Sequence, residues 1–75
     1  MEDNILQIIN IILANRTKNK LASINPGMDL RNDIGFDSLD LAELTVRIEA
    51  EYKVDVFENG IINTIGEIMD TLKAK

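Results

Sequence analysis

Apolar residues recur every three or four positions in three separate stretches, and this spacing restricts the fold more than any other feature of the sequence. Such a period places side chains on one face of an α-helix, whereas a half-buried strand needs strict alternation. The first stretch runs from Asp3 to about Asn15, the second from about Ser38 to Tyr52, and the third starts at Ile65. We therefore predict an all-α fold, a small bundle of three to four helices.

Each predicted helix has an aliphatic core face. The faces consist of Ile5, Leu6, Ile8, Ile9, Ile12 and Leu13 in the first helix, Leu41, Leu44, Thr45, Ile48 and Tyr52 in the second, and Ile65, Ile68, Met69 and Leu72 in the third. Thr64 and Glu67 have the spacing of a capping box, and Lys73 and Lys75 would complement the dipole at the other end. Between the second and third helices, residues 57–62 with Asn59 and Gly60 predict a turn or a minor helix.

A long loop is predicted between the first two helices. Residues 16–37 show no sustained period and contain Asn25-Pro26-Gly27 and Gly35. Loops of this length are uncommon in small domains and are often functional. Several of its apolar residues are expected to pin it across the bundle, and the candidates are Leu21, Ile24, Met28, Leu30, Ile34 and Phe36.

The chain has 75 residues with no Cys and no His, which limits its chemistry. We expect one domain over residues 1–75, because a chain this short has apolar residues for a single core. The missing residue types remove disulfides, the usual zinc sites and the usual catalytic triads, so we expect neither an enzyme nor a metal site. The apolar runs are too short to span a membrane and no basic flank introduces a secretory signal, so we predict a soluble, cytoplasmic protein without membrane insertion.

Acidic residues dominate the charge. The formal net charge is −5, and the segment 33–58 carries eight acidic residues against Arg47 and Lys53. Such a field repels nucleic acid and suits basic protein partners. A general role in solubility explains the charge alone equally well.

The face of the second predicted helix opposite its core carries apolar residues among charges. It comprises Leu39, Glu43, Val46 and Ala50, with Asp40 and Arg47 beside them. Single exposed apolar residues are ordinary. A central apolar pair ringed by charge is, however, typical of a docking site, and we favour that interpretation for Leu39 and Val46.

The run Gly35-Phe36-Asp37-Ser38-Leu39 stands at the start of this helix. A serine hydroxyl is a weak nucleophile unless a base activates it, and no His, Cys or other obvious base lies beside Ser38. We therefore expect Ser38 to be modified by another enzyme. The simpler alternative is that Asp37 or Ser38 merely caps the helix.

This run is one part of a wider resemblance, because the chain resembles the acyl carrier proteins over almost its whole length. The similar positions, in order, are Ile24-Asn25-Pro26, Leu30, Asp33-Ile34-Gly35, Asp37-Ser38-Leu39-Asp40, Glu43-Leu44, Ile48-Glu49 and Thr64-Ile65-Gly66-Glu67. The resemblance implies that Ser38 carries 4′-phosphopantetheine, installed from coenzyme A by a phosphopantetheinyl transferase, with Asp37 and Leu39 flanking it. The thiol of that arm would hold acyl groups as thioesters.

The resemblance also implies a recognition face for acyl transferases, synthases or ligases with basic docking patches. Its members would be Leu39, Asp40, Glu43, Val46, Arg47, Glu49 and Glu51. We expect a monomer that docks weakly, with Glu43 exposed. The free amides and the positive end of the dipole at the helix N-terminus would stabilise a phosphate on Ser38, while Asp37 and Asp40 would repel it.

Several readings remain open. Fatty-acid biosynthesis is the leading pathway that the resemblance implies. Phe36, Arg47 and Ala50 depart from housekeeping fatty-acid carriers, so a carrier for a polyketide, nonribosomal peptide, aminoacyl or cell-envelope pathway is the alternative. An unmodified acidic helical interaction module is a rival of another class. An enzyme using Asp37 and Asp40 is a weaker rival, because neighbouring carboxylates at a solvent-facing helix start lack a pocket to separate their pKa values.

Overall fold

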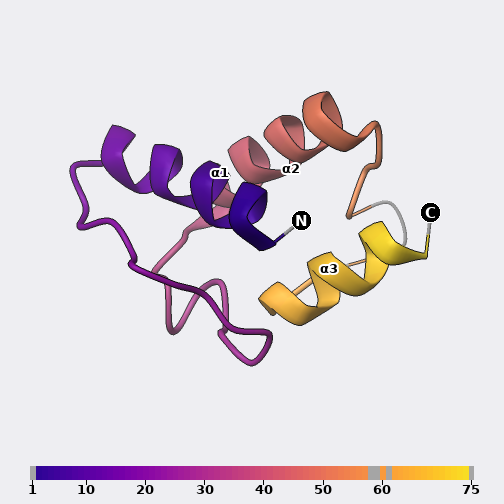
Figure 1. Cartoon of the computed structure of the whole chain (residues 1–75). Helices are drawn as coiled ribbons and strands as arrows, with labels where there is room; N and C mark the ends of the chain where they lie inside the picture. Colours follow the sequence, from indigo (N-terminus) through magenta and orange to yellow (C-terminus); the bar gives the residue numbers. More distant parts are fainter. Residues whose placement is uncertain (1, 58–59, 61, 75) are drawn as a thin grey trace.

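Three helices make up the part of the fold that the structure describes. A computed structural model describes residues 2–57, 60 and 62–74, and in these residues α1 spans Glu2–Asn15, α2 spans Ser38–Tyr52 and α3 spans Ile65–Lys73. α1 and α2 lie side by side and run in opposite directions, with α3 below them (Figure 1). The prediction of a small all-α bundle is confirmed. The predicted turn or minor helix at 57–62 includes residues 58, 59 and 61, which lie outside the described residues, as does Lys75.

One hydrophobic core joins the helices and the long loop. The predicted stripes supply most of it, because Ile5, Ile9, Leu44, Ile48 and Ile65 are completely buried. Leu6 and Tyr52 are half-buried and pack against its edge. Thr45 is half-buried as well, and its hydroxyl donates to the Leu41 carbonyl at 3.0 Å, so the middle of the predicted α2 face is partly polar.

The loop of residues 16–37 is packed into the core, as predicted. Ile24, Leu30, Ile34 and Phe36 are buried, while Leu21 and Met28 are half-buried against the same cluster. Asn10 of α1 holds the start of the loop, since its side chain accepts from the Leu21 amide at 2.8 Å and donates to the Leu21 carbonyl at 3.0 Å.

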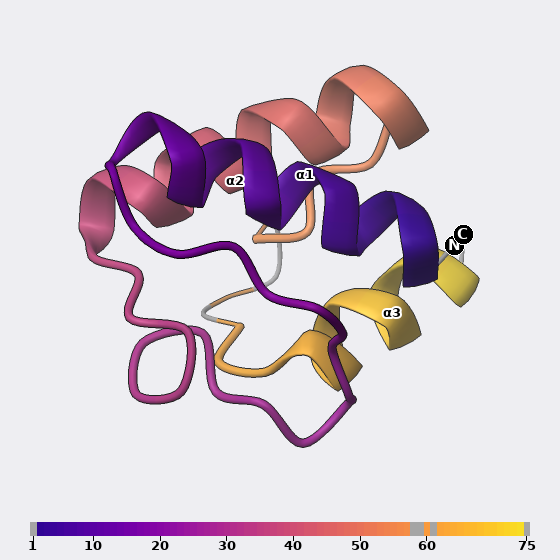
Figure 2. The ribbon, with the colours of Figure 1, turned by 60° about the vertical axis from the view of Figure 1, so that its left-hand side comes forward.

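The middle of the loop pairs with the start of α3, which Figure 2 shows from the side. The Leu30 amide donates to the Asn63 carbonyl at 2.7 Å, and the Ile65 amide donates to the Met28 carbonyl at 3.1 Å. Gly66 approaches so closely that an added Cβ would lie 2.9 Å from the Pro26 carbonyl oxygen. Glycine at this position therefore permits the loop to pack on α3.

Both later helices begin at capping boxes. Thr64 accepts from the Glu67 amide while the Glu67 carboxylate accepts from the Thr64 amide, which confirms the predicted start of α3. α2 begins in the same way with Asp37 and Asp40. No helix within the described ranges has the length and apolar content needed to cross a membrane.

Candidate functional site

Ser38 is exposed as the first residue of α2. Asp37, with φ −103° and ψ −172°, is the N-cap, which decides between the two capping residues that the sequence left open. Two residues before it, Gly35 has a φ of 87°, a left-handed conformation that glycine adopts without strain. Phe36 is buried in the core. The side chain of Asp37 caps the helix, so the Ser38 hydroxyl takes no part in the cap.

Asp37 and Asp40 form the capping box around Ser38. The Asp40 amide donates to Asp37 Oδ1 at 3.0 Å, and the Asp37 amide donates to Asp40 Oδ2 at 3.1 Å. The backbone hydrogen bond from the Asp40 amide lowers the pKa of the Asp37 carboxyl below its ordinary value. Desolvation opposes this effect, and the nearby Arg16 guanidinium lowers the pKa further. Asp37 is therefore a stable carboxylate at neutral pH.

Asp40 is buried, although the sequence places it beside the exposed face of the second helix. Its side chain is 1% exposed and lies between two cations from the start of the loop. Arg16 Nη1 lies 3.2 Å from Asp40 Oδ1, although the pair lacks the alignment of a hydrogen bond, and Lys18 Nζ lies 3.8 Å from Asp40 Oδ2. Burial of a charge requires such compensation.

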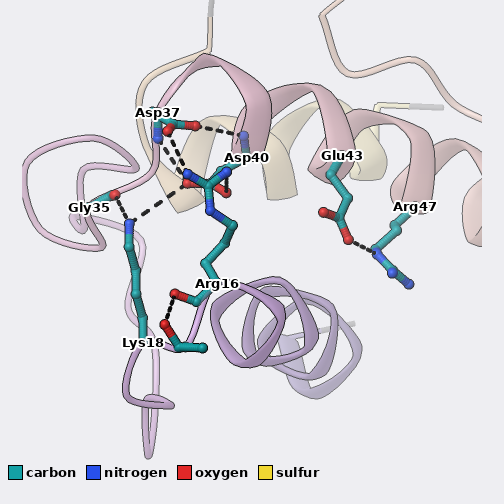
Figure 3. A network of polar contacts seen from close by, with 8 residues as sticks. Arg16, Lys18, Gly35, Asp37, Asp40, Glu43 and Arg47 are labelled. Carbon is teal, nitrogen blue, oxygen red and sulfur yellow. Dashed lines mark hydrogen bonds and ion pairs between the residues drawn. The ribbon is translucent and has the colours of Figure 1, made fainter.

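Arg16 and Lys18 are the site residues that sequence reasoning missed. Arg16 Nη2 also donates to Asp37 Oδ2 at 3.1 Å, and Lys18 Nζ donates to the Gly35 carbonyl at 2.7 Å (Figure 3). Two acidic residues at N-cap and N3 spacing could have indicated a capping box. The cations could not have been found in this way, because Arg16 and Asp37 are 21 residues apart in sequence.

The outer face of α2 exposes two apolar side chains, Leu39 at 71% and Val46 at 67%. Glu49 and Glu51 are exposed towards the C-terminal end of the helix. Glu43 is less exposed than expected, because its side chain is 34% exposed and its Oε2 accepts from Arg47 Nε at 2.8 Å. The predicted recognition residues thus all lie on α2. Among them, Asp40 is buried and Glu43 is paired with Arg47.

A mainly apolar open groove runs beside Ser38. Its lining residues come from the loop, from α2 and from the segment after α2, namely Arg31, Ser38, Leu41, Ala42, Thr45 and Phe57. A flexible, mostly uncharged chain attached at Ser38 could lie along this groove.

Comparisons with known proteins identify the class. A family model described as "Phosphopantetheine attachment site" matches residues 7–72. The chain therefore belongs to the acyl carrier protein family of phosphopantetheine-bearing carriers.

Two relatives agree with this assignment. An acyl carrier protein of Saccharopolyspora erythraea is 35% identical over 68 residues, which cover 88% of this chain and 72% of that protein. An acyl carrier protein of Trieres chinensis is 27% identical over 77 residues, which cover 100% of this chain and 96% of that protein. No solved structure gives a significant match.

Family membership confirms the predicted cofactor and the general role. The protein is a carrier with covalent 4′-phosphopantetheine and is not a catalyst. Such a carrier interacts with a phosphopantetheinyl transferase and, in general terms, with synthases.

Proposed function

We propose that Ser38 is the attachment residue and that the protein carries acyl thioesters in fatty-acid biosynthesis. The observation that carries the proposal is an exposed serine at the first position of α2 whose hydroxyl is spared from capping by Asp37. In the attachment step, the Ser38 oxygen forms a bond to a phosphorus of coenzyme A. The phosphoanhydride bond breaks, the adenosine bisphosphate portion leaves, and the transferase accepts the hydroxyl proton.

The electrostatics at Ser38 support a phosphodiester there. A phosphate at a helix N-terminus lies near unpaired amides and the positive end of the helix dipole. Asp40 is already compensated by Arg16 and Lys18, so it opposes the phosphate less than an unpaired carboxylate would. The bound group supplies a thiol for acyl transfer, and the groove beside Ser38 offers its arm an apolar surface.

The outer face of α2 fits weak docking of basic partners. Leu39 and Val46 supply an apolar centre, Glu49 and Glu51 supply exposed negative charge, and the Glu43–Arg47 pair lies between them. Weak docking suits a carrier that visits several enzymes, because the tethered cargo reaches a high local concentration once the carrier is bound. We therefore propose this face as the contact for transferases, synthases or ligases, with Asp37 and Leu39 next to the arm.

A specialised pathway is the second candidate. The observation that favours it is the Glu43–Arg47 ion pair, which makes the middle of α2 less acidic than a wholly acidic helix would be. Charging of the modified protein by malonyl transfer, followed by elongation with fatty-acid synthase enzymes, tests the leading pathway.

In either pathway we propose a single carrier domain that acts as a cytoplasmic monomer.

Mass spectrometry of the intact protein tests Ser38. The protein is incubated with coenzyme A and a promiscuous phosphopantetheinyl transferase, beside Ser38→Ala and Ser23→Ala. Ser23 is the matched control because it is the other serine of the sequence and is also exposed. We expect one added phosphopantetheine on the parent and on Ser23→Ala, and none on Ser38→Ala.

Modification of Ser38→Ala would refute the assignment of the residue. A folded parent that stays unmodified, with the transferase active on another carrier, would favour the unmodified interaction module.

A further inference from the structure

We propose that Arg16 is a positioning residue for the modification of Ser38 and that it acts through Asp40, with Lys18 in support. This inference rests on the proposed attachment at Ser38. Arg16 lies just beyond the end of α1, at the opposite end of the loop from the serine.

The first step of the argument is the burial of Asp40. Its side chain is 1% exposed, and Oδ2 accepts from the Asp37 amide as half of the capping box. Removal of its cationic partner leaves a buried carboxylate uncompensated, which strongly destabilises the buried position. We expect such a side chain to turn towards water. Rotation of Asp40 out of its site would break the capping box, so the cations maintain the first turn of α2.

The second step is that the cations bind on both sides of Ser38. The Arg16 guanidinium contacts Asp37 Oδ2 at 3.1 Å and Asp40 Oδ1 at 3.2 Å, which are the residues before the serine and two positions after it. Lys18 Nζ contacts the Gly35 carbonyl at 2.7 Å and thereby fixes the approach to the helix. Figure 3 shows both side chains reaching from the α1 side to the start of α2.

The third step concerns the reaction. Phosphoryl transfer needs the attacking oxygen in line with the bond that breaks, and small displacements lower the rate strongly. Ser38 is exposed, so its own side chain is not held by burial in the core. The order of its backbone depends on its neighbours, and those neighbours are the two aspartates held by Arg16.

Transferase kinetics test the role of Arg16. The variant Arg16→Gln removes the charge and keeps a polar side chain. Lys20→Gln is the matched control, because it removes one positive charge from an exposed lysine four residues further along the same loop. We expect Arg16→Gln to lower kcat/KM for phosphopantetheinylation by about tenfold, from misplacement of the attacking oxygen. Arg16→Lys should recover part of the loss, and Lys20→Gln should match the parent.

A double-mutant cycle with Asp40→Asn separates positioning from direct contact with the transferase. If Arg16 acts through Asp40, Arg16→Gln adds little further loss in the Asp40→Asn background. An equal fold-loss in both backgrounds would overturn the proposal, and so would an Arg16→Gln variant that is modified as fast as the parent.

Hydrogen exchange provides a readout that general destabilisation would not reproduce. The Asp40 amide donates to Asp37 Oδ1 and the Leu41 amide donates to the Asp37 carbonyl. In Arg16→Gln we expect these two amides to exchange faster while the amides of α3 keep their rates. Uniform acceleration across all helices would overturn the positioning role.

Two controls keep the outcome clear. If Arg16→Gln does not fold, Lys18→Gln is measured instead, with a smaller loss expected from its longer 3.8 Å ion pair, and no loss overturns the inference. A parent that is not modified at Ser38 refutes the proposed attachment site, whereas a modified parent with unaffected cation variants refutes this inference alone.

Discussion

The Asp37 carboxylate, one residue before the proposed attachment serine, contacts backbone amides and a cation. Oδ1 accepts from the Asp40 amide at 3.0 Å, and Oδ2 lies 3.1 Å from Arg16 Nη2. Both contacts favour the ionised form, so the pKa of Asp37 in the folded protein lies below its ordinary value of 3.8. Because the pKa is lowered on folding, this carboxylate contributes stability above its ordinary pKa and loses the contribution as the pH falls through the folded value.

The variant Asp37→Asn tests this linkage. Asparagine still caps a helix but carries no charge, so we expect a variant that is less stable at neutral pH and whose stability falls less steeply below about pH 4. Urea unfolding at a series of pH values, followed by far-UV circular dichroism, measures both effects. Asp3→Asn, in the first turn of α1, controls for the loss of one surface carboxylate. Parallel acid profiles of Asp37→Asn and the parent would contradict the prediction.

At the scale of the element, α2 separates a packed face from an exposed one. Leu41, Leu44 and Ile48 are buried, while Leu39 and Val46 are exposed two turns apart. The Glu43–Arg47 pair is four residues apart and partly exposed, so it adds a few tenths of a kcal/mol, ~0.3–0.5, to the helix. Leu39 and Val46 are mostly exposed, so they contribute much less to the stability of the fold than buried residues do. This exposure favours a role in docking.

Val46→Ser tests that role with the phosphopantetheinyl transferase as the partner. We expect KM for the carrier to rise about fivefold while kcat stays near the parent value, because a central apolar contact of the interface is removed. Ile11→Ser is the matched control, since Ile11 is an exposed apolar residue on α1 at 42%. A rise in KM of the same size for Ile11→Ser, or no rise for Val46→Ser, would argue against the α2 face. Thermal melts of both variants check that the fold is retained.

At the scale of the whole molecule, the long loop is part of the core. Leu30 is completely buried, and its amide bonds to the Asn63 carbonyl on the way into α3. Lys18 and Asn10 fix the loop to the start of α2 and to α1. A chain of 75 residues has few apolar groups to spare, so a loop that supplies core residues holds α3 against the other two helices.

Leu30→Ala measures this contribution. We expect it to lower the free energy of unfolding by ~2–5 kcal/mol, as much as Leu44→Ala in α2, because both side chains leave a cavity in one core. Urea unfolding followed by far-UV circular dichroism compares the two. Leu21→Ala, at a half-buried loop position, should cost clearly less. If Leu30→Ala costs no more than Leu21→Ala, the loop is not an equal part of the core.

The sequence predicted the features that depend on near neighbours along the chain. The predicted start of α2 at Ser38 and its end at Tyr52 match the structure, as does the capping box that starts α3, because helical faces and caps are encoded by residues three or four positions apart. α1 begins at Glu2, one residue before the expected Asp3. The burial of apolar loop residues was also predictable, because a chain this small has a single core in which they can be buried.

Only the tertiary structure decided what happens to Asp40. By helical spacing alone it lies beside an exposed face, and its burial depends on contacts with Arg16 and Lys18 from the start of the loop. The pairing of residues 26–30 with residues 63–66 has the same origin. Local patterns carry no information on which charge will meet which across a loop. The sequence by itself therefore determined the helices, their faces and the exposed serine, and the packing of the loop determined which carboxylates remain available to a partner.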